Sequence, residues 1–140
     1  MTAKEFLSQT YRIDQRINSK LEQVQSLHDL ATKAGNVLSH TAFAGTRNVH
    51  RMEDIIANMV DLEGEIKSDI SRLVEIKRDL MTVIEQVAAV EHRTLLELRY
   101  ICCKTWEEIA ANMNYSVRNI HNIHSAALKD VGKILKKKTA

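Results

Sequence analysis

Apolar residues recur every seven positions through the middle of the chain. One series consists of Met52, Met59, Ile66, Leu73, Leu80 and Val87, and a second, three residues further on, consists of Ile55, Leu62, Asp69, Ile76, Val83 and Val90. Asp69 is the one polar residue in the two series, and charged residues fill the outward positions between them. This heptad spacing is typical of coiled-coil helices, and it predicts one long helix from about Val49 to Val90.

A weaker form of the same pattern occupies the first third of the chain. Its seam positions hold Phe6, Ile13, Ile17, Val24, Leu27 and Ala31, with interruptions at Thr10 and Lys20. We expect a helix from about Thr2 to Lys33. The next segment, about 34–48, contains Gly35, Asn36 and Gly45 without a clear period, which predicts a loop. That loop could fold the two helices into an antiparallel hairpin, or it could let both pair with another subunit.

The first predicted helix is too short to cover the whole seam of the second. At the same rise per residue it covers only about half to three-quarters of that length. The remainder needs a partner subunit or the C-terminal part of the chain. We therefore expect self-association, as a homodimer, with an oligomer seam at Met59, Ile66, Leu73, Leu80 and Val87. A monomeric helical bundle is the alternative.

Composition agrees with an all-α protein. The 140 residues include no proline, four glycines and 4% aromatic residues, which is sparse for a β-sandwich or an α/β enzyme. No apolar run is long enough for a transmembrane helix, and the N-terminus has no apolar core of a signal peptide. These features predict a cytoplasmic protein that does not enter a membrane. Cys102 and Cys103 are adjacent, so they can neither staple the fold nor supply spaced metal ligands.

Charge is distributed unevenly along the chain. Residues 1–90 hold 11 lysines and arginines against 13 aspartates and glutamates, whereas residues 91–140 hold 9 against 5. The basic C-terminal part, which ends in a lysine-rich tail at 136–140, favours a polyanionic partner.

The heptad pattern stops after Val90, and two short amphipathic segments follow an expected helix at Glu91–Ile101. Thr105 can cap a helix, with Glu108 completing a capping box. The spacing of Trp106, Ile109, Ala110 and Met113 then predicts one buried stripe.

A tight turn is predicted at Asn114-Tyr115-Ser116, because Asn tolerates positive φ and Ser can cap the next helix. That helix would bury Ile120, Ile123, Ala127 and Val131. Two short amphipathic helices joined by a tight turn match a helix-turn-helix, and the small side chain of Ala110 lets them approach closely. We therefore divide the chain into a helical oligomerisation region (1–90), a helix-turn-helix domain (91–135) and the tail (136–140).

The outward face of the second helix has the chemistry of a DNA-reading surface. Arginine and asparagine can form bidentate hydrogen bonds with guanine and adenine. We predict base contacts by Arg118 and Asn122, which Asn119 and His121 flank, and phosphate contacts by Ser116, Ser125, Lys129 and Lys133. The alternative is an ordinary solvated helix face.

The stretch LELRYICCKTWEEIAANMNYSVRNIHNIHSAALKDV resembles the helix-turn-helix of sigma factor region 4. It is more similar still to phage transcriptional regulators of the ArpU/RinA type. The residues that carry the likeness are LRYI (Leu98–Ile101), TWEEIA (Thr105–Ala110) and HSAAL (His124–Leu128). The resemblance implies control of phage or prophage genes through promoter DNA, with Arg118, Asn119, His121 and Asn122 as the base-reading residues. Host RNA polymerase is a further candidate partner. Asn114 stands where many relatives have glycine, and the promoter-melting part of a complete sigma factor has no counterpart in this sequence.

No pattern indicates an enzyme. His121 and His124 lie three apart, but no acidic or cysteine partner stands at ligand spacing, so we predict no metal site. Neither a nucleophile elbow nor a glycine-rich phosphate loop is present, and we expect no cofactor. The leading hypothesis is a dimeric, sequence-specific regulator that binds double-stranded DNA. Its rivals are a DNA-packaging subunit of the small terminase type, which would form larger rings, and a protein-interaction module that contacts RNA polymerase.

Overall fold

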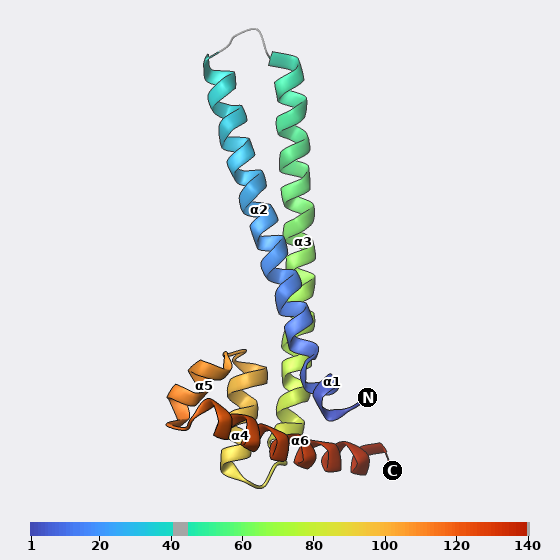
Figure 1. Ribbon diagram of the computed structural model, residues 1–140. Coiled ribbons are helices and arrows are strands. Elements are labelled where there is room, and N and C mark those ends of the chain that lie inside the picture. The colour runs from blue at the N-terminus through green and yellow to red at the C-terminus, as the bar shows by residue number, and fades with distance from the viewer. Residues whose placement is uncertain (41–44, 140) are drawn as a thin grey trace. The chain divides into compact units, whose positions relative to one another are not determined.

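The fold is all-α, as the sequence predicted. The computed structural model describes the backbone of residues 1–40 and 45–139 and the side chains of residues 1–33 and 50–138, and these parts contain helices and no strand (Figure 1). The helices are α1 (Ala3–Leu7), α2 (Gln9–His40), α3 (Gly45–Ile84), α4 (Val90–Leu96), the π-helix η1 (Glu97–Ile101), α5 (Trp106–Met113) and α6 (Val117–Thr139). No helix in the described ranges is both long enough and apolar enough to cross a membrane.

The chain divides into two compact units. One contains Met1–Ile13 together with Leu73–Ala140, and the other contains Asp14–Arg72. Both long helices contribute to both units. This division differs from the predicted boundary after residue 90, because the two ends of the predicted oligomerisation region pack with the helix-turn-helix.

The first long helix begins and ends elsewhere than predicted. Thr2 caps α1 through reciprocal hydrogen bonds with Glu5, and the helix breaks at Ser8 before α2 begins. The predicted loop at 34–48 is wrong over 34–40 and 45–48, which are helical, while residues 41–44 lie outside the described part. Extending a nucleated helix adds a hydrogen bond with each residue, so the glycine and asparagine at 35 and 36 do not stop it without a proline.

Helix α3 ends at Ile84, six residues before the prediction. The heptad pattern nevertheless continues, because Val87 is buried in the core beyond the end of the helix. Residues 85–89 turn the chain into α4, and Val90 starts that helix with a largely exposed side chain. The heptad pattern therefore predicted the burial of Val87 correctly, but it did not predict that Val87 lies beyond the end of the helix.

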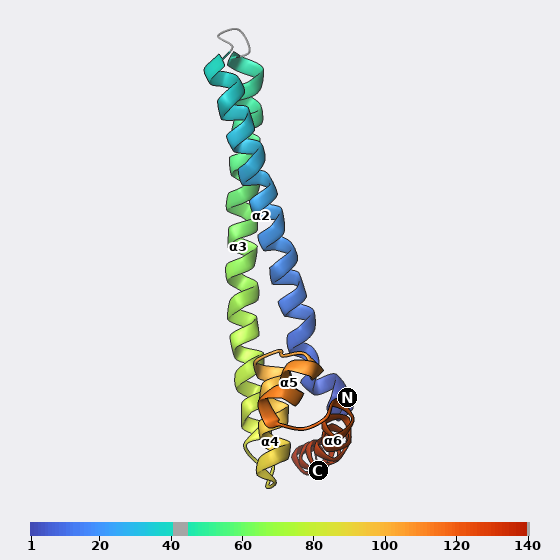
Figure 2. The same ribbon diagram turned by 60° about the vertical axis from the view of Figure 1, so that its left-hand side comes forward.

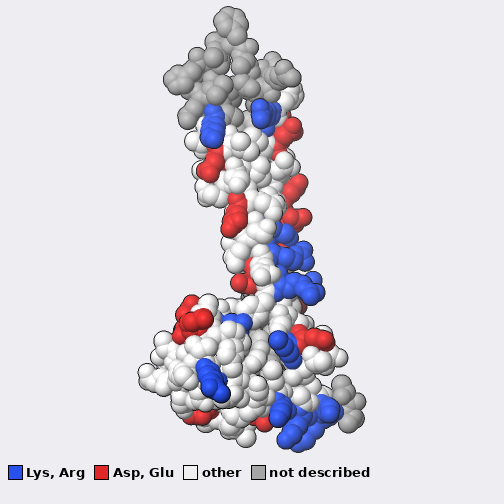
Figure 3. All heavy atoms as spheres, viewed as in Figure 1, with Lys and Arg blue, Asp and Glu red and all other residues white. Residues whose placement is uncertain are grey.

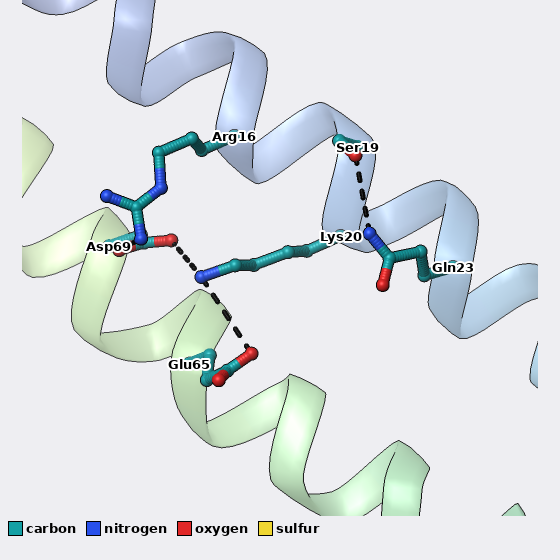
Figure 4. A network of polar contacts seen from close by, with 6 residues as sticks. All are labelled: Arg16, Ser19, Lys20, Gln23, Glu65 and Asp69. Carbon is teal, nitrogen blue, oxygen red and sulfur yellow. Dashed lines mark hydrogen bonds and ion pairs between the residues drawn. The ribbon is translucent and has the colours of Figure 1, made fainter.

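Within the Asp14–Arg72 unit, α2 and α3 run side by side in opposite directions (Figures 1 and 2), so the chain forms the hairpin alternative. Ile17, Ile55 and Ile66 are buried seam residues. The interruptions at Lys20 and Asp69 face one another, with Nζ of Lys20 2.7 Å from Oδ2 of Asp69 (Figure 4). This hydrogen bond, assisted by the positive charges of Lys20, Arg16 and Arg72, lowers the pKa of Asp69 despite the opposing effect of its burial. The polar exceptions of the two patterns are thus one ion pair.

The core of the other unit joins distant parts of the chain. Its buried residues are Leu7, Leu80, Val83, Ile84, Val87, Leu96, Tyr100, Ala127 and Val131. The end of the α3 seam is therefore covered by α1 and α6 of the same chain. Thr10, the other interruption of the first pattern, is buried and donates its hydroxyl hydrogen bond to the carbonyl oxygen of Tyr100 at 3.0 Å. Helix α6 continues to Thr139, so the lysines of the predicted tail extend a helix.

Candidate nucleic-acid interface

Helices α5 and α6 form the predicted pair around a tight turn. The Thr105 hydroxyl accepts a hydrogen bond from the backbone N–H of Glu108 at 3.2 Å, which caps α5. Asn114 ends α5 in the left-handed conformation at φ 58°. The Ser116 hydroxyl then accepts from the N–H of Asn119 at 3.1 Å and caps α6. Each polar residue of the turn therefore has the local role expected from its type.

A small apolar core holds the two helices together. It consists of buried Leu95, Ile109, Ala110 and Ile120, with Leu98, Trp106, Met113, Tyr115 and Ile123 packed against them. The predicted inward residues of α5 and of the start of α6 lie here. Tyr115 also donates its hydroxyl hydrogen bond to the Glu91 carboxylate, which raises the pKa of the tyrosine and ties the turn to α4.

The outward face of α6 presents most of the predicted DNA-contacting residues together. Since a helix turns about 100° per residue, Arg118, His121, Asn122, Ser125, Lys129 and Lys133 fall on one side, and all six are exposed. We call these six residues the outer stripe. Asn119 lies about 100° from Arg118 and is partly buried, which separates it from the stripe. Ser116 is at the exposed start of the helix, where its hydroxyl is already engaged as the cap.

The electrostatics of α6 favour an anion on this face. The outer stripe carries three cationic side chains, and further lysines follow at 136–138. The single acidic residue of α6, Asp130, lies on another face and is paired with His92, with 2.6 Å between Oδ2 and Nδ1. Figure 3 shows blue side chains gathered over the C-terminal part of α6 on the face in view. A polyanion approaching the outer stripe would meet no carboxylate belonging to α6.

An aromatic cluster that the sequence did not predict lies behind the start of the outer stripe. The Arg99 guanidinium carbon is 4.1 Å from the ring centroid of Trp106 and 5.0 Å from that of Tyr11. The Trp106 ring centroid is in turn 4.7 Å from the centroids of both His121 and His124. His121 is therefore an exposed residue whose ring also contacts Trp106, which packs against the core between α5 and α6.

His124 is buried, and burial is the largest of the effects that lower its pKa, to about 4. The positive charges of Arg99, Lys4 and His121 act in the same direction. Burial also raises the pKa of Tyr100 to about 12. The protonated phenol can therefore donate to the neutral imidazole, whose Nε2 lies 2.6 Å away. His124 is a packing residue, and no group of three potential metal-ligating side chains is found among the described residues.

The π-helix η1 explains why these groups meet. It follows α4 directly and ends the helical segment Val90–Ile101. The last carbonyl oxygens of a helix lack intrahelical donors. Tyr11 and Thr10 on α2 donate to the carbonyl oxygens of Arg99 and Tyr100, and the Arg99 side chain donates to the carbonyl oxygen of Lys104 at 2.9 Å. These contacts span up to 90 positions in the chain, so no local spacing could have indicated them.

The predicted oligomer seam is occupied within one chain. Ile66, Leu80 and Val87 are buried, and Met59 and Leu73 are partly buried. Apolar positions with this spacing can be covered by an intramolecular helix as well as by a second subunit, and the periodicity alone does not distinguish the two.

Comparison with known proteins places the chain in a family without placing its function. Neither a curated protein nor a solved structure matches it significantly. A family model matches residues 33–132, which include all of α3, α4, η1 and α5 and the outer stripe up to Lys129. The match covers more than half of the chain, and the protein therefore belongs to the family described as protein of unknown function DUF1492.

Proposed function

We propose that the protein binds double-stranded DNA in a sequence-specific manner, with α6 as the helix that enters the major groove. The observation that carries this proposal is the outer stripe: cationic, amide and imidazole side chains on the exposed face of the second helix of a helix-turn-helix pair. An α-helix fits the width of the major groove, where base pairs differ in their donors and acceptors.

The residues of the stripe divide into two roles. Arg118 and Asn122, near the start of α6, are suited to base edges, since both can form two hydrogen bonds with one base. Lys129 and Lys133, about two and three turns beyond Asn122, are suited to phosphates. His121 is held against Trp106 and offers a ring nitrogen to the groove. Asn119 is a weaker candidate because it is partly buried.

The biological setting rests on resemblance. The similarity to phage regulators of the ArpU/RinA type supports control of phage or prophage transcription in a bacterial host. The similarity of the same stretch to sigma factor region 4 makes host RNA polymerase a candidate partner. Control of transcription through promoter DNA depends on DNA binding by this chain, whereas contact with RNA polymerase does not require it.

The decisive experiment selects retained sequences from a random pool of double-stranded DNA at about 150 mM salt, where phosphate-only binding is weakened. We expect an enriched motif. Retention without a motif, lost as salt rises, would instead favour a packaging subunit, and no retention would favour a protein-binding surface.

Substitution of Arg118 tests whether the stripe reads bases. Arg118→Ala should weaken binding to the selected motif by about 1–3 kcal/mol and relax preference at one base pair. Lys129→Ala should weaken all sequences alike and reduce the salt dependence. Arg78→Ala is the matched control, since Arg78 is an exposed arginine on α3, and its binding should equal that of the wild type. An Arg118→Ala variant with unchanged sequence preference would remove this residue from the reading surface.

A further inference from the structure

A second apolar stripe lies on α3, apart from the seam that packs against α2. Ile56, Val60 and Ile70 are 50%, 60% and 46% exposed, although residues of these types are usually buried. With about 100° per residue, they share one helix face with Glu63 and Lys67, all within about 40° of its centre. Helix α3 is unbroken to Ile84, and the same register adds Val74, which is also half exposed. An exposed apolar face of this kind marks a candidate interaction surface.

The order of residues along this face is symmetric. The stripe consists of Ile56, Val60, Glu63, Lys67, Ile70 and Val74, separated by steps of four, three, four, three and four residues. Read from either end, it gives two β-branched apolar residues followed by a charged one, and the two central charges are opposite. Residue 65 lies midway between Ile56 and Val74, between Val60 and Ile70, and between Glu63 and Lys67. We call these six positions the symmetric stripe.

Such a stripe is complementary to a second copy of itself in the antiparallel direction. A two-fold axis that crosses the stripe at the level of residue 65 sets Val60 opposite Ile70 of the other copy. It also sets Glu63 opposite Lys67 of the other copy. Alternating steps of three and four are the spacing by which two helices interlock side chains. A two-fold interface uses the same patch on both subunits. In a parallel, in-register pair, Glu63 would face Glu63 and Lys67 would face Lys67, so the charges select the antiparallel arrangement.

Gly64 gives an independent indication of close approach. It lies in an exposed part of α3, where glycine destabilises a helix relative to alanine. A Cβ atom built there would meet no atom within 4 Å, so the described parts of the chain do not explain the glycine. Ala57 and Ser71, one heptad to either side, are also small and exposed. Small side chains on this flank would let a second helix approach the symmetric stripe closely.

From the apolar exposure, the symmetry and the central charges, we propose that two copies of the protein form an antiparallel dimer through the symmetric stripe of α3. The dimer uses a face of α3 different from the predicted seam, which is filled within each chain. It does not depend on DNA binding by α6.

A charge exchange between two full-length variants tests the pairing. Glu63→Lys sets lysine against Lys67 of the other copy, and Lys67→Glu sets glutamate against Glu63. Each variant alone should dimerise at least about tenfold more weakly than the wild type. An equimolar mixture should regain dimers, because every central pair then joins opposite charges. Each chain in the mixture keeps its own altered helix, so a change in folding cannot account for the recovery.

The measurement is sedimentation equilibrium at low salt, starting from the 16.0 kDa mass of one chain. Asp61→Lys is the matched control for Glu63→Lys, because it makes the same charge change at an exposed position off the stripe. Its dimerisation should equal that of the wild type. Circular dichroism verifies that all variants are helical. A monomeric wild type would overturn the proposal, as would a mixture no more dimeric than its separate components. Dimers that neither variant weakens would place the interface elsewhere.

Discussion

His124 shows how one buried side chain links α6 to the rest of its unit. It accepts the hydrogen bond of Tyr100 and packs edge-on against Trp106, and its surroundings lower its pKa to about 4. In the unfolded chain a histidine has a pKa of about 6.5. Between these two values the unfolded chain binds a proton that the folded one does not.

Stability should therefore fall as the pH is lowered through this window. For His124 alone, the free energy of unfolding should decrease by about 2 kcal/mol from pH 7 to pH 5. Urea unfolding at the two pH values measures the change. His124→Gln should remove most of this difference, whereas His28→Gln, at an exposed position, should retain it. An equal pH dependence in the wild type and His124→Gln would show that His124 does not supply it.

Single residues differ in how much of their structural role local sequence reveals. The left-handed conformation of Asn114 was predicted, because asparagine tolerates positive φ and stands between two helical patterns. Cys103 also has positive φ, at 54°, but cysteine has no such preference. Its conformation follows from the end of η1, where the N–H of Lys104 reaches back to the carbonyl oxygen of Leu98 at 3.0 Å. The first conformation follows from a residue preference, whereas the second follows from a backbone hydrogen bond that no residue preference indicates.

At the scale of elements, the Lys20–Asp69 pair sets the alignment of α2 against α3. Each helix has one polar residue in its seam here, and their contact puts the apolar seam positions on either side in register. A shift by one heptad would bury the Asp69 carboxylate among apolar side chains, which is costly. The pair thus acts chiefly by excluding other alignments.

Replacing one partner should cost more than replacing both. Lys20→Leu leaves the Asp69 carboxylate in an apolar seam and should lower Tm by roughly 5 °C. Lys20→Leu combined with Asp69→Leu makes the seam continuous and should restore Tm to the wild-type value or above. Thermal unfolding followed by circular dichroism makes the comparison. A single variant as stable as the wild type would mean that Asp69 is well solvated without Lys20.

For the whole molecule, the main finding is that the helix-turn-helix belongs to a discontinuous unit. Leu7 of α1 and Leu80 of α3 share a core with Ala127 and Val131 of α6. The N-terminal segment therefore contributes directly to the stability of the proposed DNA-binding part.

Trp106, the one tryptophan of the chain, can report on this connection because it lies beside α6. Leu7→Ala should destabilise the unfolding transition seen by Trp106 fluorescence by about 2–5 kcal/mol, the usual result of shortening a fully buried leucine. Leu21→Ala, at a half-exposed leucine of α2, should change it much less. An unshifted transition in Leu7→Ala would support the predicted boundary after residue 90 instead.

The sequence by itself determined the all-α class, the two long helices, and the positions of the turn and inward residues around α5 and α6. Each of these depends on periodicity or on the preferences of neighbouring residues, which are local properties. Only the tertiary structure decided that the α3 seam is covered by the same chain, that α3 ends at Ile84, and that Arg99 lies between Tyr11 and Trp106. Those features come from contacts between distant segments, where several partners of similar chemistry could satisfy the same pattern.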